Sequence, residues 1–400
     1  MIAKFTKCTL NGEISAPPSK SMAHRYLIGA ALTKENCVIS GIEYSQDILA
    51  TIDCLKALGC EIKTKDDTVY INSKNFLKVE NAILNCRESG STLRFFIPIC
   101  LTLSKRVTLI GSDRLFERPL DVYQKICDEN GFEFQKNKDS LIICGNLKSG
   151  TYKVDGSISS QFITGLIFAF LSIGEQAEIK IVPPFESRSY INLTIQALKQ
   201  FGAEIEFLDE FTISITPSSL HAFEGKVEGD YSNAAFLDCF NFLGSDITIK
   251  NLKPNSLQGD KIYLDYFKKI ENSTPILDIN DCPDLAPVLI ALASLKNGAT
   301  LTGTNRLKVK ESDRGQAMHQ ELKKLGGGLL FGDNIITVPK QALHTGGPRL
   351  YGHNDHRIVM ALSLILSKIG GEIEGCEAVN KSYPSFFTDI KSLNAKVELI

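Results

Sequence analysis

One short pattern recurs six times along this chain of 400 residues: a helical segment ends on Gly or Asn and passes directly into a strand-like segment. Examples are LKALGCEI, LKQFGAEI and LKKLGGGL. Gly and Asn readily adopt the left-handed conformation that ends many helices. The turn residues are Gly59, Gly131, Gly202, Asn272, Gly326 and Asn394, at successive separations of 72, 71, 70, 54 and 68 residues. This spacing predicts six copies of one αβ unit.

The repeats predict an α/β (α+β) fold of two domains. A unit of this length holds a few strands and a couple of amphipathic helices, which need a common core, so three units per domain is the natural grouping. The shorter fourth interval predicts that a surface hairpin is missing there. The alternative is that a helix-Gly-strand junction is simply a common αβ connection.

The charge balance argues against large anionic partners. Lys and Arg number 44 against 46 Asp and Glu, so no overall field would recruit nucleic acid or an anionic membrane. No early apolar stretch suits a secretory signal, and no later one reaches the length of a membrane span. We therefore expect a cytoplasmic protein with no nucleic-acid or membrane partner.

The cysteines and histidines do not indicate a metal site. Eleven cysteines are scattered without a CxxC pair and are expected to be buried, reduced thiols. His353 and His356 form an HxxH pair, but beside them only Asp355 is a candidate ligand. We expect neither a metal nor another cofactor.

Several apolar helices are predicted to begin directly after small or polar residues, over 19–32, 90–103, 159–171, 283–295 and 355–366. Helix starts carry unpaired N–H groups and positive dipole ends. If these starts faced one cleft, they would bind anions without any net positive charge on the protein. The pattern is typical of a site for a phosphorylated, carboxylated substrate.

Motifs in the first half place polar side chains at these helix starts. Lys20, Ser21 and Arg25 either bind an anion or belong to an ordinary capped helix that faces water. Hydroxyls and an amide stand together before a strongly apolar helix in DGSISSQF, and PPFESRSY offers a matching pair in the next repeat. These residues are Ser159, Ser160 and Gln161, followed by Ser187 and Tyr190.

Motifs in the second half add carboxylates and further cations. Asp284 begins a buried-looking helix and is either its cap or a general base. Lys310, Glu311 and Arg314 form either an ion-paired helix face or a buried acid with two cations. Arg357, in NDHR, is expected to meet a carboxylate, and Lys381, in NKSYP, adds one more cation.

Taken together, the chain resembles the 3-phosphoshikimate 1-carboxyvinyltransferase family, also called 5-enolpyruvylshikimate-3-phosphate synthase. The motifs SKSxxxR, GSTLR, ERP, DGSxSSQF, ESRSY, VKESDR, NDHR and NKSYP follow one another in the family's order and cover essentially the whole chain. The resemblance implies six βαβαββ units, three per domain, with the active site in a cleft between the domains. The first domain would comprise 1–18 plus 229–400 and the second 19–228.

The resemblance also implies a role for each motif residue. Asp284 would be the base for the 5-hydroxyl, Glu311 and Lys310 the proton-transfer pair at the methylene carbon, and Lys20 a further catalytic cation. 3-Phosphoshikimate would be held by Lys20, Ser21, Arg25, Ser159, Ser160, Gln161, Ser187, Tyr190, Asp284 and Lys310. Phosphoenolpyruvate would be held by Lys20, Gly90, Arg118, Gln161, Arg314, His356, Arg357 and Lys381.

The implied reaction is enolpyruvyl transfer from phosphoenolpyruvate to 3-phosphoshikimate in aromatic amino-acid and chorismate biosynthesis, carried out by a monomer. Two positions depart from the family pattern. Glu88 and Arg306 each stand where many members have Asn. The shape of the phosphoenolpyruvate pocket and one contact to the shikimate phosphate are therefore open.

Two other functions remain as alternatives. The sister transferase that acts on UDP-N-acetylglucosamine would normally have Asn and Cys where this chain has Ser21 and Asp113. A non-catalytic module that binds phosphorylated ligands or nucleic acid would need a basic stripe but neither Asp284 nor Glu311. The near-neutral charge and the paired carboxylates favour an enzyme.

Overall fold

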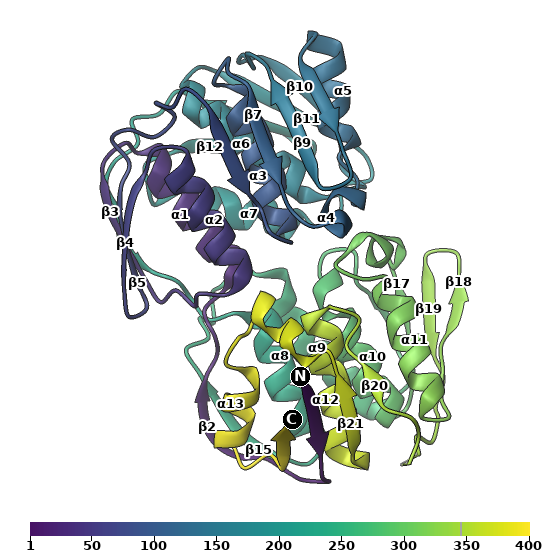
Figure 1. Ribbon diagram of the computed structural model, residues 1–400. Coiled ribbons are helices and arrows are strands. Elements are labelled where there is room, and N and C mark those ends of the chain that lie inside the picture. Colours follow the sequence, from purple (N-terminus) through teal and green to yellow (C-terminus); the bar gives the residue numbers. More distant parts are fainter. Residues whose placement is uncertain (345) are drawn as a thin grey trace. The chain divides into compact units, whose positions relative to one another are not determined.

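The computed structural model describes residues 1–344 and 346–400 and divides into two compact units (Figure 1). Unit 1 comprises Met1–Pro17 and Gly229–Ile400, and unit 2 comprises Pro18–Glu228. The chain therefore passes between the units twice, and unit 1 is assembled from both ends of the sequence.

Unit 2 alternates short strands with helices. Its helices are α1 (Lys20–Leu32), α2 (Gln46–Ala57), α3 (Gly90–Leu101), α4 (Asp113–Glu117), α5 (Asp121–Asn130), α6 (Ser160–Ile173) and α7 (Arg188–Lys199). Its strands are β3 (Asn36–Ser40), β4 (Glu61–Lys65), β5 (Thr68–Asn72), β6 (Ala82–Asn85), β7 (Val107–Ile110), β8 (Glu133–Lys136), β9 (Ser140–Cys144), β10 (Thr151–Asp155), β11 (Ala177–Val182), β12 (Glu204–Phe207), β13 (Thr212–Thr216) and β14 (Glu224–Lys226).

Unit 1 has the same alternation and adds 3₁₀ turns, labelled η. Its helices and turns are α8 (Tyr231–Phe242), η1 (Gly259–Ile262), α9 (Tyr263–Asn272), η2 (Pro283–Leu285), α10 (Ala286–Leu295), η3 (Asn305–Val309), α11 (Arg314–Lys324), α12 (His356–Ile369), η4 (Cys376–Lys381) and α13 (Phe386–Ser392). Its strands are β1 (Ile2–Phe5), β2 (Asn11–Ser15), β15 (Asp246–Lys250), β16 (Ile276–Asp278), β17 (Ala299–Thr302), β18 (Leu330–Gly332), β19 (Ile335–Val338), β20 (Leu350–Tyr351), β21 (Gly371–Glu374) and β22 (Val397–Leu399).

The described strands form six small sheets, and five of these have four strands in one common arrangement. A parallel pair is followed by two antiparallel neighbours, as in β10-β11-β13-β12 and β16-β17-β19-β18. Two of the sheets are completed from far along the chain: β14 pairs with β3, and β1 pairs with β21 and β22. The predicted α/β class with a repeated unit is confirmed.

The sixth sheet contains only the parallel pair β2 and β15. Here α9 ends at Asn272, and the next strand, β16, already belongs to the following sheet. The hairpin that the other units carry is missing at the place where the interval between repeats is short, as the sequence predicted.

Five of the six predicted turn residues have left-handed backbone conformations. The φ angles are +99° at Gly59, +67° at Gly131, +86° at Gly202, +83° at Gly326 and +68° at Asn394. Asn272 differs from the other five: it ends α9, as the pattern predicts, but it is followed by an extended Ser273 and has no left-handed backbone.

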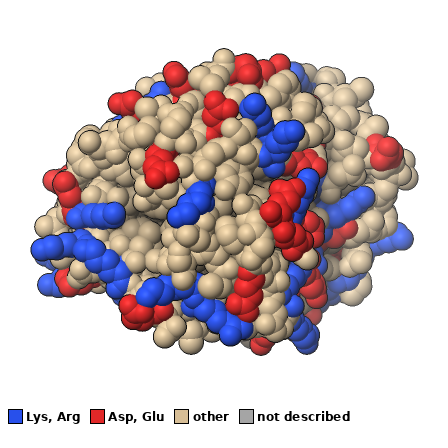
Figure 2. All heavy atoms as spheres, turned by 90° about the horizontal axis from the view of Figure 1, so that it is seen from above, with Lys and Arg blue, Asp and Glu red and all other residues tan. Residues whose placement is uncertain are grey.

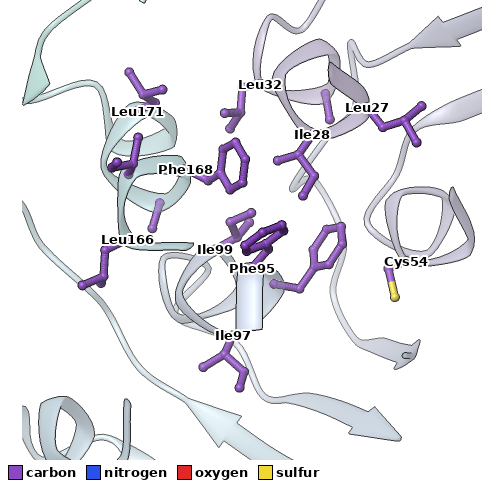
Figure 3. Close-up of a cluster of buried hydrophobic side chains, with 14 of the residues drawn as sticks. Leu27, Ile28, Leu32, Cys54, Phe95, Ile97, Ile99, Leu166, Phe168 and Leu171 are labelled. Atoms are coloured by element: carbon purple, nitrogen blue, oxygen red, sulfur yellow. The ribbon is translucent and has the colours of Figure 1, made fainter. Parts of the chain in front are cut away.

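The core of unit 2 is built from helices that are buried on nearly every side. Helix α6 is apolar over most of its length and is buried from Phe162 to Leu171, a pattern typical of a helix inside a core. Figure 3 shows side chains of α1, α3 and α6 meeting there. Phe95 and Phe168 pack edge to face with ring centroids 5.4 Å apart.

The core of unit 1 has the corresponding composition around α8, α10 and α12. The predicted helix over 283–295 begins with the 3₁₀ turn η2, and the α-helix itself starts at Ala286. None of the helices in the described part of the chain is both long and apolar enough to cross a membrane.

Charged side chains of both signs are interspersed on the face of the molecule drawn in Figure 2. Neither the basic nor the acidic residues cover this face as a continuous area. The distribution agrees with the near balance of charges in the sequence, 44 basic against 46 acidic residues.

Candidate active site

In unit 2, Lys20 is the first residue of α1 and forms an ion pair with Asp47 of α2. Its Nζ lies 2.7 Å from Oδ2 of Asp47, and the side chains are 15% and 11% exposed. Ser19 caps the helix by accepting from the backbone N–H of Met22. The lysine is therefore held at a helix start, close to the surface, by a carboxylate that the sequence did not indicate.

Arg25 brings two other predicted residues together through their backbone carbonyls. It donates from Nη1 to the carbonyl of Ser21 at 2.6 Å and from Nη2 to that of Tyr190 at 3.0 Å, while Nε donates to Oγ1 of Thr194 at 2.8 Å. Its guanidinium also lies 5.8 Å from the ring centroid of Phe95. Burial lowers the pKa of Arg25 to about 10, which still leaves it charged at neutral pH.

Gly90 begins α3 and lies directly against the guanidinium of Arg118. A Cβ atom built on Gly90 would lie 2.4 Å from Nη1 of Arg118. Arg118 follows the short helix α4 and is 7% exposed. Only a glycine leaves room for the arginine in this position.

The predicted group at the start of α6 is held by Arg94 of α3. Gln161 accepts from Nη1 of Arg94 at 2.7 Å and donates from Nε2 to Oγ of Ser91 at 2.9 Å. Ser159 caps α6 by accepting from the backbone N–H of Gln161, and Ser160 is the first residue of the helix. Arg94 lies in the GSTLR motif, one helical turn after Gly90, and this spacing was the signal that could have identified it.

Ser187 immediately precedes α7 and has a left-handed backbone, with φ of +56°. It is 1% exposed. Tyr190 lies in the first turn of the same helix, so the two residues predicted from PPFESRSY occupy one helix start.

In unit 1, the carboxylate of Asp284 is the centre of a cluster of cations. Its Oδ1 lies 2.7 Å from Nη1 of Arg314 and 3.2 Å from Nζ of Lys310. Its Oδ2 lies 3.1 Å from Nη2 of Arg357. These residues come from η2, from the loop after η3, and from the first turns of α11 and α12. We call Asp284, Lys310, Glu311, Arg314, Asp355 and Arg357 the unit 1 cluster.

Arg314 joins all three carboxylates of the unit 1 cluster. Besides Asp284, it reaches Oε2 of Glu311 at 2.8 Å and Oδ2 of Asp355 at 2.9 Å. The Arg314 side chain is only 1% exposed. Burial alone would lower its pKa, but Asp355, Glu311 and Asp284 outweigh burial and raise it. Each of the two interpretations of VKESDR holds in part: Glu311 and Arg314 form an ion pair at i,i+3, and the arginine is buried while the Glu311 side chain is 18% exposed.

The charged groups of the unit 1 cluster shift one another's pKa values. Burial would raise the pKa of Asp284, yet Arg357, Lys310 and Arg314 together hold that pKa well below its usual range. Burial, assisted by Arg314 and Arg306, lowers the pKa of Lys310 to about 8, against the opposing effect of Asp284. The cluster thus contains an ionised carboxylate beside a lysine that titrates near physiological pH.

Arg357 is positioned by its own helix start and keeps donors for a ligand. Its backbone N–H donates to Asp355, the cap of α12, and Nη2 also donates to Oγ of Ser232 at 3.0 Å. Its Nε and Nη1 are buried and have no hydrogen-bond partner among residues 1–344 and 346–400. Burying such donors is costly without an acceptor, so this geometry fits an arginine that binds an anion.

Lys381 and the two histidines lie around the start of α12. Lys381 donates from Nζ to the carbonyl of Asn354 at 2.6 Å. His353 contacts Glu321, with Nε2 2.8 Å from Oε1, whereas Nδ1 of buried His356 lies 3.8 Å from Oδ1 of Asp355. The HxxH pair therefore contacts different carboxylates. In the described part of the chain, no group of three or more His, Cys, Asp or Glu could hold a metal ion.

Asp47, Arg94 and Ser232 were not indicated by the sequence. Each contacts a predicted residue that is distant along the chain: Asp47 meets Lys20, Arg94 meets Gln161, and Ser232 meets Arg357. Such contacts depend on how the helices pack. For Asp47 and Ser232, the surrounding sequence contains no motif from which the contact could be predicted.

Comparison with solved structures identifies the fold. The chain matches the structure of an EPSP synthase from Acinetobacter baumannii with a TM-score of 0.78 and 21% identity, covering 99% of each chain. It matches the enolpyruvyl transferase NikO from Streptomyces tendae with a TM-score of 0.77 and 14% identity, covering 99% of this chain and 98% of the other. The fold is that of the two-domain enolpyruvyl transferases.

Sequence comparison then gives the family. The family model for EPSP synthase (3-phosphoshikimate 1-carboxyvinyltransferase) matches residues 6–390. A 3-phosphoshikimate 1-carboxyvinyltransferase from Clostridium perfringens is 40% identical, with 97% of each chain covered, and one from Clostridioides difficile is 37% identical, with 99% and 98% covered. The chain belongs to the EPSP synthase family.

Members of this family are transferases whose reaction is enolpyruvyl transfer to 3-phosphoshikimate in aromatic amino-acid and chorismate biosynthesis. This chain is accordingly a transferase of the shikimate pathway. The alternative acceptor, UDP-N-acetylglucosamine, is not favoured by these relatives.

Proposed function

We propose that this chain transfers the enolpyruvyl group of phosphoenolpyruvate to the 5-hydroxyl of 3-phosphoshikimate, and that Asp284 is the base for that hydroxyl. The observation that carries the assignment of Asp284 is its contact with three cations, Lys310, Arg314 and Arg357. Both substrates are polyanions, so a site for them needs clustered cations. When the substrates are absent, carboxylates must balance the charge of these cations.

Asp284 would become a stronger base when substrates bind. In the structure, its three cationic neighbours hold its pKa well below its usual range, so the carboxylate has little affinity for a proton. Anionic substrates would attract the same cations and weaken their hold on Asp284. The pKa of Asp284 would then rise toward the range in which a carboxylate can accept a proton from a hydroxyl.

Phosphoenolpyruvate would be bound by cations from both units. Arg357 offers buried Nε and Nη1 donors to a carboxylate, and Arg314 and Lys381 add charge nearby, with His356 at the start of the same helix as Arg357. From unit 2, Lys20, Arg118 and Gln161 would bind the anion beside Gly90, whose lack of a side chain leaves room for the guanidinium of Arg118.

3-Phosphoshikimate would use the hydroxyl-rich helix starts of unit 2. Ser159, Ser160 and Ser187 precede or begin α6 and α7, where backbone N–H groups favour a phosphate. Ser21, Arg25, Gln161 and Tyr190 would bind the remainder of the molecule, with Arg25 on its carboxylate. Lys20, Asp284 and Lys310 are further proposed ligands of 3-phosphoshikimate.

In the proposed chemical steps, the side chains act by transferring protons. Glu311 with Lys310 would deliver a proton to C3 of phosphoenolpyruvate while Asp284 takes the proton of the 5-hydroxyl, whose oxygen bonds to C2. The tetrahedral adduct then loses inorganic phosphate as its C2–O bond breaks, and the Glu311–Lys310 pair takes a proton back from C3 to restore the vinyl ether. Orientation of the two substrates and electrostatic stabilisation of the cationic centre would supply most of the rate enhancement.

The test is the release of inorganic phosphate from phosphoenolpyruvate in the presence of EDTA. We expect release on adding 3-phosphoshikimate and none on adding UDP-N-acetylglucosamine. Release with the sugar nucleotide alone would assign the sister reaction, and binding of 3-phosphoshikimate without any release would indicate a non-catalytic binding protein. We also propose that the enzyme is a cytoplasmic monomer, which light scattering at working concentration would test.

A further inference from the structure

A buried row of polar side chains joins three helices of unit 2 close to Lys20 and Gly90, two of the ligands proposed for phosphoenolpyruvate. Nδ1 of His24 in α1 lies 2.8 Å from Oγ1 of Thr51 in α2, which in turn lies 2.8 Å from Oγ1 of Thr92 in α3. Thr92 donates to Oγ of Ser89 at 2.7 Å. His24 is 1% exposed, and the three hydroxyl residues are fully buried. None of these four residues has a part in the chemistry proposed above.

Each end of the row lies next to a proposed anion ligand. His24 follows Lys20 by four residues, and Thr51 follows Asp47 by four residues, so each pair lies on one face of its helix. The His24–Thr51 contact is therefore a second link between the same two helices, one turn below the Lys20–Asp47 ion pair. At the other end, Ser89 caps α3 immediately before Gly90.

Thr92 connects the two ends of the row. Its backbone N–H donates to Oγ of Ser89 at 3.2 Å, and its hydroxyl also lies 3.4 Å from the carbonyl of Asp47. A change in the position of Thr92 would therefore alter both the cap of α3 and the backbone of Asp47. The position of Lys20 depends on its partner Asp47, and the position of Gly90 depends on the cap of α3.

The row is better suited to fixing geometry than to stabilising the fold. Replacing a buried hydrogen-bonded pair by apolar groups of the same shape is nearly neutral for stability, whereas a satisfied polar network specifies one arrangement of the helices. Burial, with Lys20 and Arg25 nearby, lowers the pKa of His24 well below its usual value. The imidazole is therefore neutral and directs a hydrogen bond without adding charge.

We propose that His24 is a positioning residue for phosphoenolpyruvate binding, acting through Thr51 and Thr92 to fix the Lys20–Asp47 pair and the first turn of α3. This inference rests on the proposed function, because it takes Lys20 and Gly90 to be ligands of that substrate.

The test compares two substitutions at one position with a control at the end of α1. Thr51→Val removes the hydroxyl and keeps the shape, Thr51→Ser keeps the hydroxyl, and Thr33→Val removes a buried hydroxyl that bonds to the carbonyl of Ala30, far from Lys20. We expect Thr51→Val to raise KM for phosphoenolpyruvate about tenfold, equivalent to losing one well-placed contact, with kcat little changed. Thr51→Ser should restore KM, and Thr33→Val should leave it unchanged.

An unchanged KM for phosphoenolpyruvate in Thr51→Val, with a loss of thermal stability equal to that of Thr33→Val, would overturn the proposal. If Thr51→Val does not fold, His24→Leu gives the same test, with His24→Asn as the variant that keeps a hydrogen-bonding group near the position of Nδ1. Lys20→Met separates the two proposals. If Lys20→Met turns over normally, the proposed function of Lys20 fails; if it is impaired while the His24 and Thr51 variants are not, only the positioning role fails.

Discussion

Arg314 donates from Nη1 to Oδ1 of Asp284 at 2.7 Å, from a guanidinium that is only 1% exposed. Losing this partner would leave the buried charge of the arginine without one of its counterions, and the contact helps to hold the pKa of Asp284 well below its usual range. In the proposed mechanism, the substrates must loosen this contact before Asp284 can accept a proton.

Removing the carboxylate of Asp284 tests its role as the base. We expect Asp284→Ala to lower kcat by about 10²–10⁴-fold, the usual effect of losing a general base, while 3-phosphoshikimate binding stays detectable. Phosphate release and calorimetric titration would measure the two quantities. Asp53→Ala removes an exposed carboxylate paired with Arg87 and should behave as wild type. Near-normal turnover of Asp284→Ala would exclude it from the mechanism.

The pKa of Lys310 predicts how activity falls at high pH. Since burial lowers that pKa to about 8, the ammonium is present below pH 8 and is lost as pH rises through this value. We expect kcat/KM measured from about pH 6 to about pH 10 to decline above about 8. In Lys310→Arg, the residual activity should lack this decline because a guanidinium does not titrate there. A decline at the same pH in both proteins would assign it to another group.

The close approach of Gly90 to Arg118 predicts the effect of a single methyl group. In Gly90→Ala, the new Cβ would lie 2.4 Å from Nη1 of Arg118, so the guanidinium must move. We expect KM for phosphoenolpyruvate to rise about tenfold, as for one lost contact, and KM for 3-phosphoshikimate to change much less. Gly328→Ala is the matched control, since its Cβ would meet nothing closer than 3.6 Å. Equal effects on both substrates would contradict the assignment of Arg118.

Arg357 is predicted to need its planar guanidinium. The side chain reaches Ser232 and Asp284 through Nη2 and leaves Nε and Nη1 for a ligand, a division that a lysine cannot reproduce. We expect Arg357→Lys to weaken phosphoenolpyruvate binding about 10–100-fold, the loss of one charge-assisted hydrogen bond. Arg349→Lys, at an exposed ion pair with Glu372, should leave binding unchanged. Tight binding by Arg357→Lys would show that charge alone suffices.

The fold could be predicted from the sequence because the signals for it are local. Gly59 and Gly326 mark helix ends through their own backbone conformations, and the short interval after Asn272 corresponds to a hairpin that the β2-β15 sheet lacks. The same reasoning located the end of α9 at Asn272, although the backbone there is followed by an extended Ser273 and has no left-handed turn.

The contacts within the candidate site could be predicted from the sequence only in part. VKESDR shows that Glu311 and Arg314 are close on one helix start, but not that Arg314 also reaches Asp284 and Asp355. Those contacts join residues 30 and 41 positions apart, and they depend on how η2, α11 and α12 pack. Ion-paired surface helices and buried charge clusters have the same sequence pattern until the packing is known.

The ends of the chain lie side by side in unit 1, where Ile2 and Ile400 exchange backbone hydrogen bonds of 2.8 Å. Joining them by a short linker and opening the chain between Glu228 and Gly229 would make each unit continuous in sequence. The interruption of unit 1 by unit 2 thus reflects only the order in which the segments follow one another along the chain. A circular permutant of this kind should keep both hydrophobic cores and cross from one unit to the other only once.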